Sequence, residues 1–300
     1  MTAETVSGSA RPYRIRIGAG VRAASDAVPP SGLVLLAIVS VQVGAGLAKN
    51  LFAMLPPSAV VFLRISTGAL VLVAIALPRV RGLSRKDLLA GAAFGVSLGL
   101  MNLSFYEALA RLPMGIAVAI EFIGPLTVAV VASRRRLDLL WVVLAAAGIM
   151  LLAPWGKAAG ASWAGIGFAL GAGALWAAYI LLSASVGRRF PGTTGLSFAM
   201  LVSTLVIAPV GITAGGMDLL RPEILLLGLG VGLLSSVIPY TLELEALRRM
   251  PKRVFGILMS LEPAAAALVG LFILGEVLHL REWAAIGCVV IASIGATRSN

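Results

Sequence analysis

Residues 243–287 read ELEALRRMPKRVFGILMSLEPAAAALVGLFILGEVLHLREWAAIG, an apolar stretch that is interrupted near its middle by Glu262 and Pro263. An ionised glutamate in hydrocarbon costs at least a few kcal/mol. Pro263 also removes a backbone hydrogen-bond donor, and lipid cannot satisfy the carbonyl that loses it. We therefore expect this stretch to face protein or a water-filled cavity rather than lipid, and to form one wall of a path.

The composition of the whole chain indicates an all-α polytopic membrane protein. It is 59% hydrophobic and 12% charged, with a mean hydropathy of +1.01, which exceeds the apolar content of an ordinary soluble protein. The net charge of +11 comes from basic residues that cluster between apolar runs, so we expect membrane lipids and no nucleic acid as partners. One cysteine and one histidine, Cys288 and His279, are too few for a disulfide or a multi-His/Cys metal site. We expect no metal and no cofactor.

Apolar windows long enough to cross a bilayer core predict ten transmembrane helices. A crossing helix needs roughly 17–25 residues. Pro57, Pro113 and Pro251 open three of the windows, at the helix position that tolerates proline best. The predicted spans are 32–54, 57–77, 88–109, 113–132, 137–153, 162–186, 193–213, 223–247, 251–274 and 281–297.

The distribution of lysine and arginine predicts the orientation of these spans. Most basic residues fall in loops on the side of the two termini, and only Arg111, Lys157, Arg221 and Arg281 fall in loops on the other side. Because basic loops stay in the cytoplasm, we expect both termini to be cytoplasmic. Residues 1–31 are basic and lack an apolar signal segment, which predicts a cytoplasmic tail.

An internal repeat is visible in the middle of each half of the chain. EALARLP at residues 107–113 matches EALRRMP at residues 245–251, and the same register aligns Pro125 with Pro263. Both prolines are therefore candidates for helix kinks or hinges that belong to the architecture. Glu262, in contrast, aligns with a glycine, so its charge belongs to one half only.

The repeat predicts two halves of opposite orientation. The first covers residues 32–153 and the second covers 162–298, with five predicted spans each, integrated into one membrane domain. Because five is an odd number, the second half enters the membrane from the opposite side. Inverted repeats of this kind are typical of alternating-access transporters, whose substrate site lies near the midplane between the halves.

Glycines repeat every four residues on two predicted spans. Gly91, Gly95 and Gly99 lie on the third span, and Gly167 and Gly171 lie on the sixth. Small faces of this kind let helices approach closely. We expect tight packing within the molecule rather than dimerisation, which is compatible with a monomer.

Several charged residues in the spans have a structural explanation. Glu107 with Arg111, and Glu245 with Arg249, are spaced i,i+4 in the last turn before a proline, which predicts structural ion pairs. Lys49 lies close enough to its helix end to extend its amine to the outer membrane interface.

Three other charged residues are candidate sites for a proton or another charge. Arg64 is either a structural counter-charge or a contact for a substrate carboxylate. Glu121 and Glu262 lie well inside predicted spans, and each is either a functional carboxylate or a partner in helix packing. Glu262 is the stronger candidate, because Pro263 frees carbonyls one turn upstream that can line a cavity.

Polar and aromatic stripes at helical spacing predict the remaining cavity residues. The stripes pair Asn102 with Tyr106, Trp176 with Tyr179 and Ser183, and Ser236 with Tyr240 and Glu243. Helix packing and interface anchoring are the alternative explanation. The residues chosen for a cavity that binds an amphiphilic organic solute are Gln42, Asn102, Tyr106, Trp176, Tyr179, Tyr240 and Glu262.

The sequence resembles the EamA-type permeases of the drug/metabolite transporter superfamily over about residues 32–298. The resemblance rests on FLRISTGALVLV at 62–73, EALARLPMGIAVAIEFIGPL at 107–126, and LEPAAAALVGLFILGE at 261–276 followed by Ile-Gly at 286–287. The last motif looks most like the amino-acid exporters, including the threonine/homoserine and aromatic amino-acid branches.

The resemblance implies export of amino acids or related small metabolites from the cytoplasm across a bacterial inner membrane. Only Arg64, Glu262 and Pro263 coincide with motif positions, and motif glutamates in this family can be architectural. The predicted function is therefore a secondary transporter that works by alternating access and binds its substrate in a central midplane cavity. Coupling to protons and uncoupled facilitation both remain open.

Three other functions compete with this prediction. The first is an exporter or facilitator of other drug-like or metabolite solutes. The second is an intramembrane enzyme, which we disfavour because such sites need His/Asp, Ser/His or metal constellations within the spans. The third is a passive channel, which we disfavour because no ring of like polar residues repeats along one face.

Overall fold

The computed structural model describes residues 28–75, 82–132, 138–152, 162–190 and 194–299, and every regular element in these ranges is helical. The predicted tail lies almost entirely outside them. In chain order the elements are α2 (Pro30–Asn50), η1 (Leu51–Ala53), α3 (Pro57–Ile75), α4 (Arg85–Leu109), α5 (Met114–Glu121), α6 (Ile123–Ala132), α7 (Asp138–Leu152), α8 (Trp163–Arg189), α9 (Thr194–Gly215), η2 (Gly216–Leu220), α10 (Pro222–Gly232), η3 (Leu233–Val237), α11 (Ile238–Arg249), α12 (Lys252–Met259), α13 (Glu262–Leu274) and α14 (Leu280–Ser299).

Many of these helices have the length and apolar composition of transmembrane helices. Within the described ranges, 7 stretches are long and apolar enough to cross one, and Met114–Val128 is a shorter apolar helix. The prediction of an all-α polytopic membrane protein is therefore confirmed. Each predicted window contains helix, whereas the number of ten crossings stays a prediction. The 7 stretches are Pro30–Ala53, Pro57–Ala74, Arg85–Leu109, Trp163–Ser183, Thr194–Leu220, Pro222–Glu243 and Val254–Leu274.

Two predicted spans consist of two consecutive helices with a short break between them. Phe122 separates α5 from α6, and Ser260 and Leu261 separate α12 from α13. Pro125 and Pro263 each lie in the first turn of the second helix, where an N–H has no intrahelical acceptor. The break therefore precedes the proline in both halves, and a hinge role for either proline stays a prediction.

A π-helical turn, η3, joins α10 to α11. Pro239 follows this turn and has no N–H to donate to the carbonyl of Ser235, four residues earlier. That carbonyl accepts instead from Arg64 Nη2 at 3.0 Å, and the carbonyl of Leu234 accepts from Ser40 Oγ at 2.7 Å. The irregular turn thus ties this part of the chain to α3 and α2.

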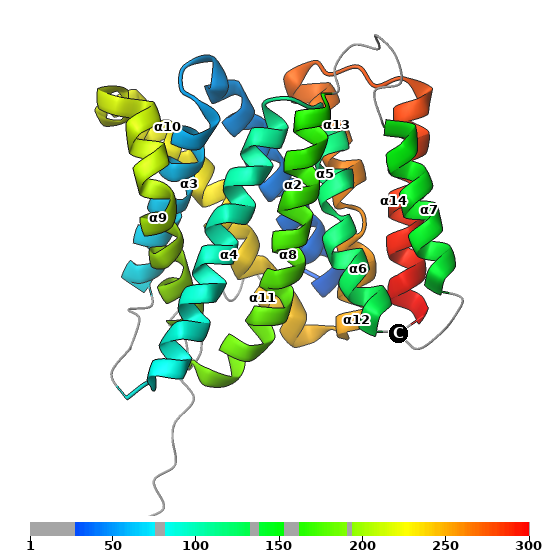
Figure 1. The fold of residues 1–300 in the computed structure, drawn as a ribbon, viewed down its shortest axis with the longest axis horizontal. Coiled ribbons are helices and arrows are strands. Elements are labelled where there is room, and N and C mark those ends of the chain that lie inside the picture. Colours follow the sequence, from blue (N-terminus) through cyan, green and yellow to red (C-terminus); the bar gives the residue numbers. More distant parts are fainter. Residues whose placement is uncertain (1–27, 76–81, 133–137, 153–161, 191–193, 300) are drawn as a thin grey trace, which may run out of the picture.

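The main helix pairs each join a helix from the first half of the chain to a helix from the second half. α4 packs on α8, α2 on α11, α3 on α9, α5 on α13, and α7 on α14. In Figure 1, α7 and α14 lie at one edge of the molecule and α3, α9 and α10 lie at the other. The helices between these edges enclose the interior in which the candidate site lies.

The glycine stripe of α4 packs within the molecule, as predicted. A Cβ on Gly95 would lie 2.6 Å from the carbonyl oxygen of Ala199, so α4 and α9 meet backbone to backbone there. Gly91 and Gly99 also face α9 side chains. The prediction is wrong for Gly167 and Gly171, because a Cβ at either would meet no heavy atom of the described structure within 4 Å.

Both predicted i,i+4 ion pairs are present at helix ends. Arg111 Nη1 contacts Glu107 Oε2, and Arg249 Nη2 contacts Glu245 Oε1. Each pair lies just before the proline that forms the N-cap of the next helix. The two predicted ion pairs are therefore confirmed.

Candidate functional site

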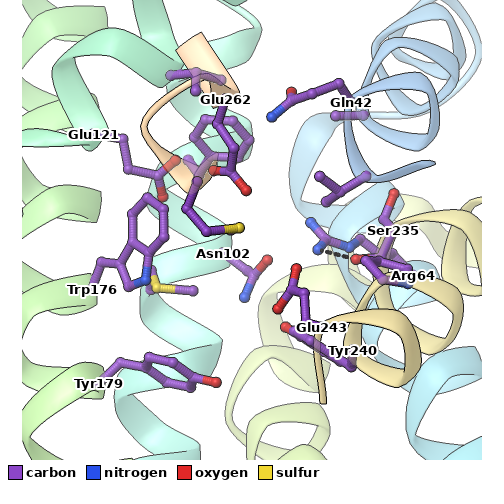
Figure 2. A pocket seen from close by; sticks show the side chains of 17 residues that line it. Gln42, Arg64, Asn102, Glu121, Trp176, Tyr179, Ser235, Tyr240, Glu243 and Glu262 are labelled. Atoms are coloured by element: carbon purple, nitrogen blue, oxygen red, sulfur yellow. Dashed lines mark hydrogen bonds between the residues drawn. The ribbon is translucent and has the colours of Figure 1, made fainter. Parts of the chain in front are cut away.

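A cavity of about 160 Å³ lies between the two halves of the chain (Figure 2). Side chains from α2, α3, α4, α5 and α8 line it together with side chains from η3, α11, α12 and α13. Eight residues singled out from the sequence meet here: Gln42, Arg64, Asn102, Glu121, Trp176, Tyr179, Tyr240 and Glu262. The geometry brings them together, and their roles in binding stay predictions.

Among the described residues that line this cavity, Arg64 is the only basic one. Its side chain is buried, and it donates to the carbonyl oxygen of Ser235 at 3.0 Å and to the Tyr106 hydroxyl at 3.5 Å. No carboxylate of the described residues forms an ion pair with it, and its Nε has no hydrogen-bond partner. Arg64 thus presents a buried positive charge without a counter-ion in contact.

Three carboxylates line the same cavity. Glu121 is the last residue of α5, Glu262 is the first residue of α13, and Glu243 lies on α11. Figure 2 shows their carboxylates reaching into the space from different walls. None of the three forms a hydrogen bond or ion pair with another residue in the described ranges. Because buried carboxylates need compensation, this cavity suits a ligand that carries a positive group or protons.

Two amides add neutral polar groups. Asn102 Nδ2 donates to the carbonyl of Leu98 at 2.8 Å, which leaves its side-chain oxygen free to accept from a ligand. Gln42 is buried on α2 and lines the cavity. The site therefore offers hydrogen-bond donors and acceptors as well as charges.

Aromatic side chains fix one wall of the cavity. Tyr179 stacks on Phe94 with ring centroids 4.7 Å apart, and Trp176 meets Phe122 edge to face at 5.4 Å. These contacts hold both rings from behind and leave their other faces toward the cavity (Figure 2). The wall is aromatic and partly apolar, which suits the carbon atoms of an organic solute.

Tyr106 is the one predicted cavity residue that does not line the cavity. It is fully buried, and Arg64 lies over its ring at 5.5 Å from the centroid. The i,i+4 spacing from Asn102 places Tyr106 on the same face of α4, as predicted. One turn further along the helix, however, Arg64 covers the Tyr106 ring and lines the cavity in its place. Tyr106 thus contacts Arg64 rather than the cavity.

Sequence reasoning did not select several residues that line the cavity. Glu243 lies three residues after Tyr240, on the same helix face. That spacing is a signal from which Glu243 could have been predicted as a cavity residue. Ser235 reaches the cavity because of the π-helical turn, for which only Pro239 gave a hint. Pro239 itself also lines the cavity. The other additional lining residues are Val41, Ala45, Met101, Phe105, Val118 and Met259, which are apolar and give no distinctive signal.

An ion pair joins helix ends at one end of the bundle. Lys49 Nζ lies 2.6 Å from Glu276 Oε1 and also donates to the carbonyl of Leu112 at 2.6 Å. The other oxygen of Glu276 accepts from the backbone N–H of Met114 at 2.7 Å. Lys49 is therefore paired rather than extended to the interface, which corrects that prediction. The pair joins the ends of α2 and α13 to the start of α5.

The described residues contain no group of three or more His, Cys, Asp or Glu side chains that could hold a metal ion. The cavity carboxylates are spread over different walls. Cys288 is a free thiol on α14. The chemistry available in this cavity is that of charge, hydrogen bonding and aromatic packing.

Comparison with known proteins agrees with this geometry. Residues 163–298 match the EamA-like transporter family. Over 269 residues the chain is 42% identical to the threonine/homoserine exporter RhtA of Escherichia coli (strain K12), covering 89% of this chain and 91% of that protein. The threonine/homoserine exporter RhtA of Salmonella typhimurium (strain LT2) is 41% identical over the same length.

More distant proteins extend the likeness. An uncharacterized transporter of Bacillus subtilis (strain 168), YwfM, is 30% identical over 170 residues, 56% of this chain and 57% of that protein. A solved crystal structure that is 17% identical superposes with a TM-score of 0.57 over 90% of this chain and 95% of that chain. At that identity the superposition supports the fold alone.

Proposed function

The chain belongs to the EamA-like transporter family, and we propose that it exports threonine, homoserine or chemically similar small amino acids from the cytoplasm. Family membership confirms the prediction of a transporter rather than an enzyme. The substrate class is supported by the 42% identity to a threonine/homoserine exporter over most of both chains.

The cavity supports a small zwitterionic substrate. Its volume of about 160 Å³ is well below the roughly 300 Å³ at which pockets for drug-sized ligands begin. Arg64 offers a partner for a carboxylate, and Glu121, Glu243 and Glu262 offer partners for an ammonium group. Asn102 can accept from a side-chain hydroxyl. A large apolar drug would leave these charges without partners, which disfavours the alternative of a drug exporter.

Alternating access between two inverted halves is supported by the way the helices pair. The contact of α4 with α8 has its counterpart in that of α11 with α2, and α3–α9, α5–α13 and α7–α14 each join corresponding helices of the two halves. The breaks before Pro125 and Pro263 also correspond. This pattern is expected from two five-span repeats that face each other, with ten crossings in total.

The closed end of the bundle lies on the side that we assign to the outside. Lys49 and Glu276 hold that end together. Arg85 at the start of α4 and Arg249 at the end of α11 lie at the opposite end and, with the other basic residues of the sequence, predict the cytoplasmic side. In this arrangement the cavity is positioned to receive substrate from the cytoplasm. Opening toward the outside then requires the contacts around Lys49 to separate.

Efflux from intact cells tests the proposed export. Bacterial cells that overproduce the protein are loaded with labelled threonine, and the label in the medium is followed over time. We expect faster efflux than from cells with the empty vector, and unlabelled homoserine inside the cells should slow it by competition. Equal efflux with and without the protein would contradict the proposal.

A further inference from the structure

We propose that Pro239 and Tyr106 are positioning residues that hold Arg64 as the receptor for the carboxylate group of the substrate. The inference rests on the proposed function and deepens it. Neither residue is needed to supply a charge of its own. Their contribution is to fix the orientation of the guanidinium and to leave part of it free for a ligand.

Pro239 acts through the backbone of the π-helical turn. In a regular helix, residue 239 would donate its N–H to the carbonyl of Ser235, and proline cannot do this. Arg64 Nη2 takes that place at 3.0 Å. π-helical turns of this kind often occur at functional sites, and here the turn creates an acceptor for a side chain from another helix.

Tyr106, on α4, contacts the guanidinium of Arg64. Its hydroxyl accepts from Arg64 Nη1 at 3.5 Å, and the guanidinium carbon lies 5.5 Å from the centre of its ring. The tyrosine is fully buried and does not line the cavity. The Tyr106 ring packs against the guanidinium of Arg64, and the Tyr106 hydroxyl accepts from one guanidinium nitrogen. Together these two contacts fix the orientation of the guanidinium.

The remaining part of Arg64 is available to an anion. An arginine has five N–H donors, and the Tyr106 hydroxyl and the Ser235 carbonyl use one each, from Nη1 and Nη2. Nε has no partner among the described residues but is itself buried, whereas the side chain as a whole is 7% exposed and lines the cavity. The donors left for a ligand are therefore the second N–H groups of Nη1 and Nη2. A planar guanidinium with adjacent free N–H groups matches a planar carboxylate, which it can bind through two parallel hydrogen bonds.

Selectivity for the free acid follows from this arrangement. An amino-acid amide keeps the ammonium group but has no negative charge to offer Arg64. If Arg64 is held in place by Pro239 and Tyr106, loss of either residue weakens binding of the acid much more than binding of the amide. A merely structural role of either residue would affect both ligands equally.

Exchange in proteoliposomes tests the inference with purified full-length protein. Uptake of labelled threonine against internal threonine gives the half-saturating concentration, and inhibition by threoninamide reports binding without the carboxylate. For Pro239→Ala and Tyr106→Phe we expect the half-saturating concentration of threonine to rise about tenfold, which is the effect of one lost hydrogen bond to a charged group. The concentration of threoninamide that gives half-maximal inhibition should change less than twofold, because the amide makes no contact that depends on the orientation of Arg64.

Pro209→Ala is the matched control, because Pro209 also lies within a helix, α9, but does not line the cavity. It should leave both values unchanged. Equal shifts for threonine and threoninamide, or no shift in either variant, would overturn the inference. Tyr106→Phe keeps the ring and the packing, so the test stands even if Pro239→Ala folds poorly. Wild-type protein that exchanges no amino acid would instead overturn the proposed function.

Discussion

Position 262 has room for a carboxylate, whereas position 124, its counterpart in the repeat, has none. A Cβ on Gly124 would lie 2.0 Å from the carbonyl oxygen of Gly173, because α6 and α8 cross there. Glu262 lines the cavity instead. The charge that distinguishes the two halves therefore follows from a close helix crossing in one half and an open space in the other.

Gly124→Ala is predicted to destabilise the protein by about 1–3 kcal/mol, because an added methyl group forces α6 and α8 apart. Thermal unfolding of the purified protein in detergent measures this as a lower Tm. Gly167→Ala is the matched control on α8, since its added Cβ would meet no described atom within 4 Å. A Tm loss of equal size in both variants would contradict the explanation of this crossing.

Glu262→Gln is predicted to reduce amino-acid transport about tenfold, since it replaces a carboxylate that can bind the ammonium group by a neutral amide. If Glu262 also exchanges a proton, the variant loses the response of wild-type flux to an imposed pH gradient. Flux in proteoliposomes at several pH values measures both effects. Glu223→Gln, at the exposed start of α10, is the control. Unchanged flux of Glu262→Gln at every pH would show that Glu262 is structural.

At the scale of helices, the sequence predicts the positions of the helices well and their irregularities less well. Apolar length and proline punctuation are local properties, so α3 begins at Pro57 as predicted. The break at Phe122 and the turn at Ser235 depend on partners from distant helices, which the local pattern does not contain. The same reason explains Lys49, whose partner Glu276 lies at the end of another span.

Glu276→Gln is predicted to lower the free energy of unfolding by about 1–3 kcal/mol, between the effects of exposed and fully buried ion pairs. The substitution removes the negative charge that pairs with Lys49 and weakens the hydrogen bond that the side chain accepts from the Met114 N–H. Thermal unfolding in detergent measures the loss. Asp218→Asn removes the exposed partner of Arg221 and should have little effect. Comparable losses in the two variants would contradict a special role for the closed end.

At the scale of the whole molecule, the sequence was most informative about the cavity. Two of its polar residues, Asn102 and Tyr240, occupy matching positions of the repeat, and the structure places both on the cavity wall. Tyr106 and Glu243 show the limit of this reasoning, because a helical stripe predicts the face of a helix but not what covers it. The covering residue, Arg64, comes from another helix.

The orientation of the molecule leads to a prediction of its own. Arg134, Arg135 and Arg136 lie outside the described residues, in a loop that the charge distribution assigns to the cytoplasm. A tag inserted there should be inaccessible to a membrane-impermeant reagent in intact cells and accessible after permeabilisation. A tag in the loop that contains Lys157 should be labelled in intact cells. The reverse pattern would contradict the assignment of the two sides.

The most direct test of the account is flux of labelled solutes across proteoliposomes that contain the purified protein, measured for a panel of amino acids with and without a pH gradient. We predict saturable transport of threonine and homoserine, little transport of N-acetylated or amidated forms, and none in protein-free liposomes. Absence of amino-acid flux while unrelated metabolites are transported would contradict the proposed substrate class and the zwitterion-binding cavity around Arg64.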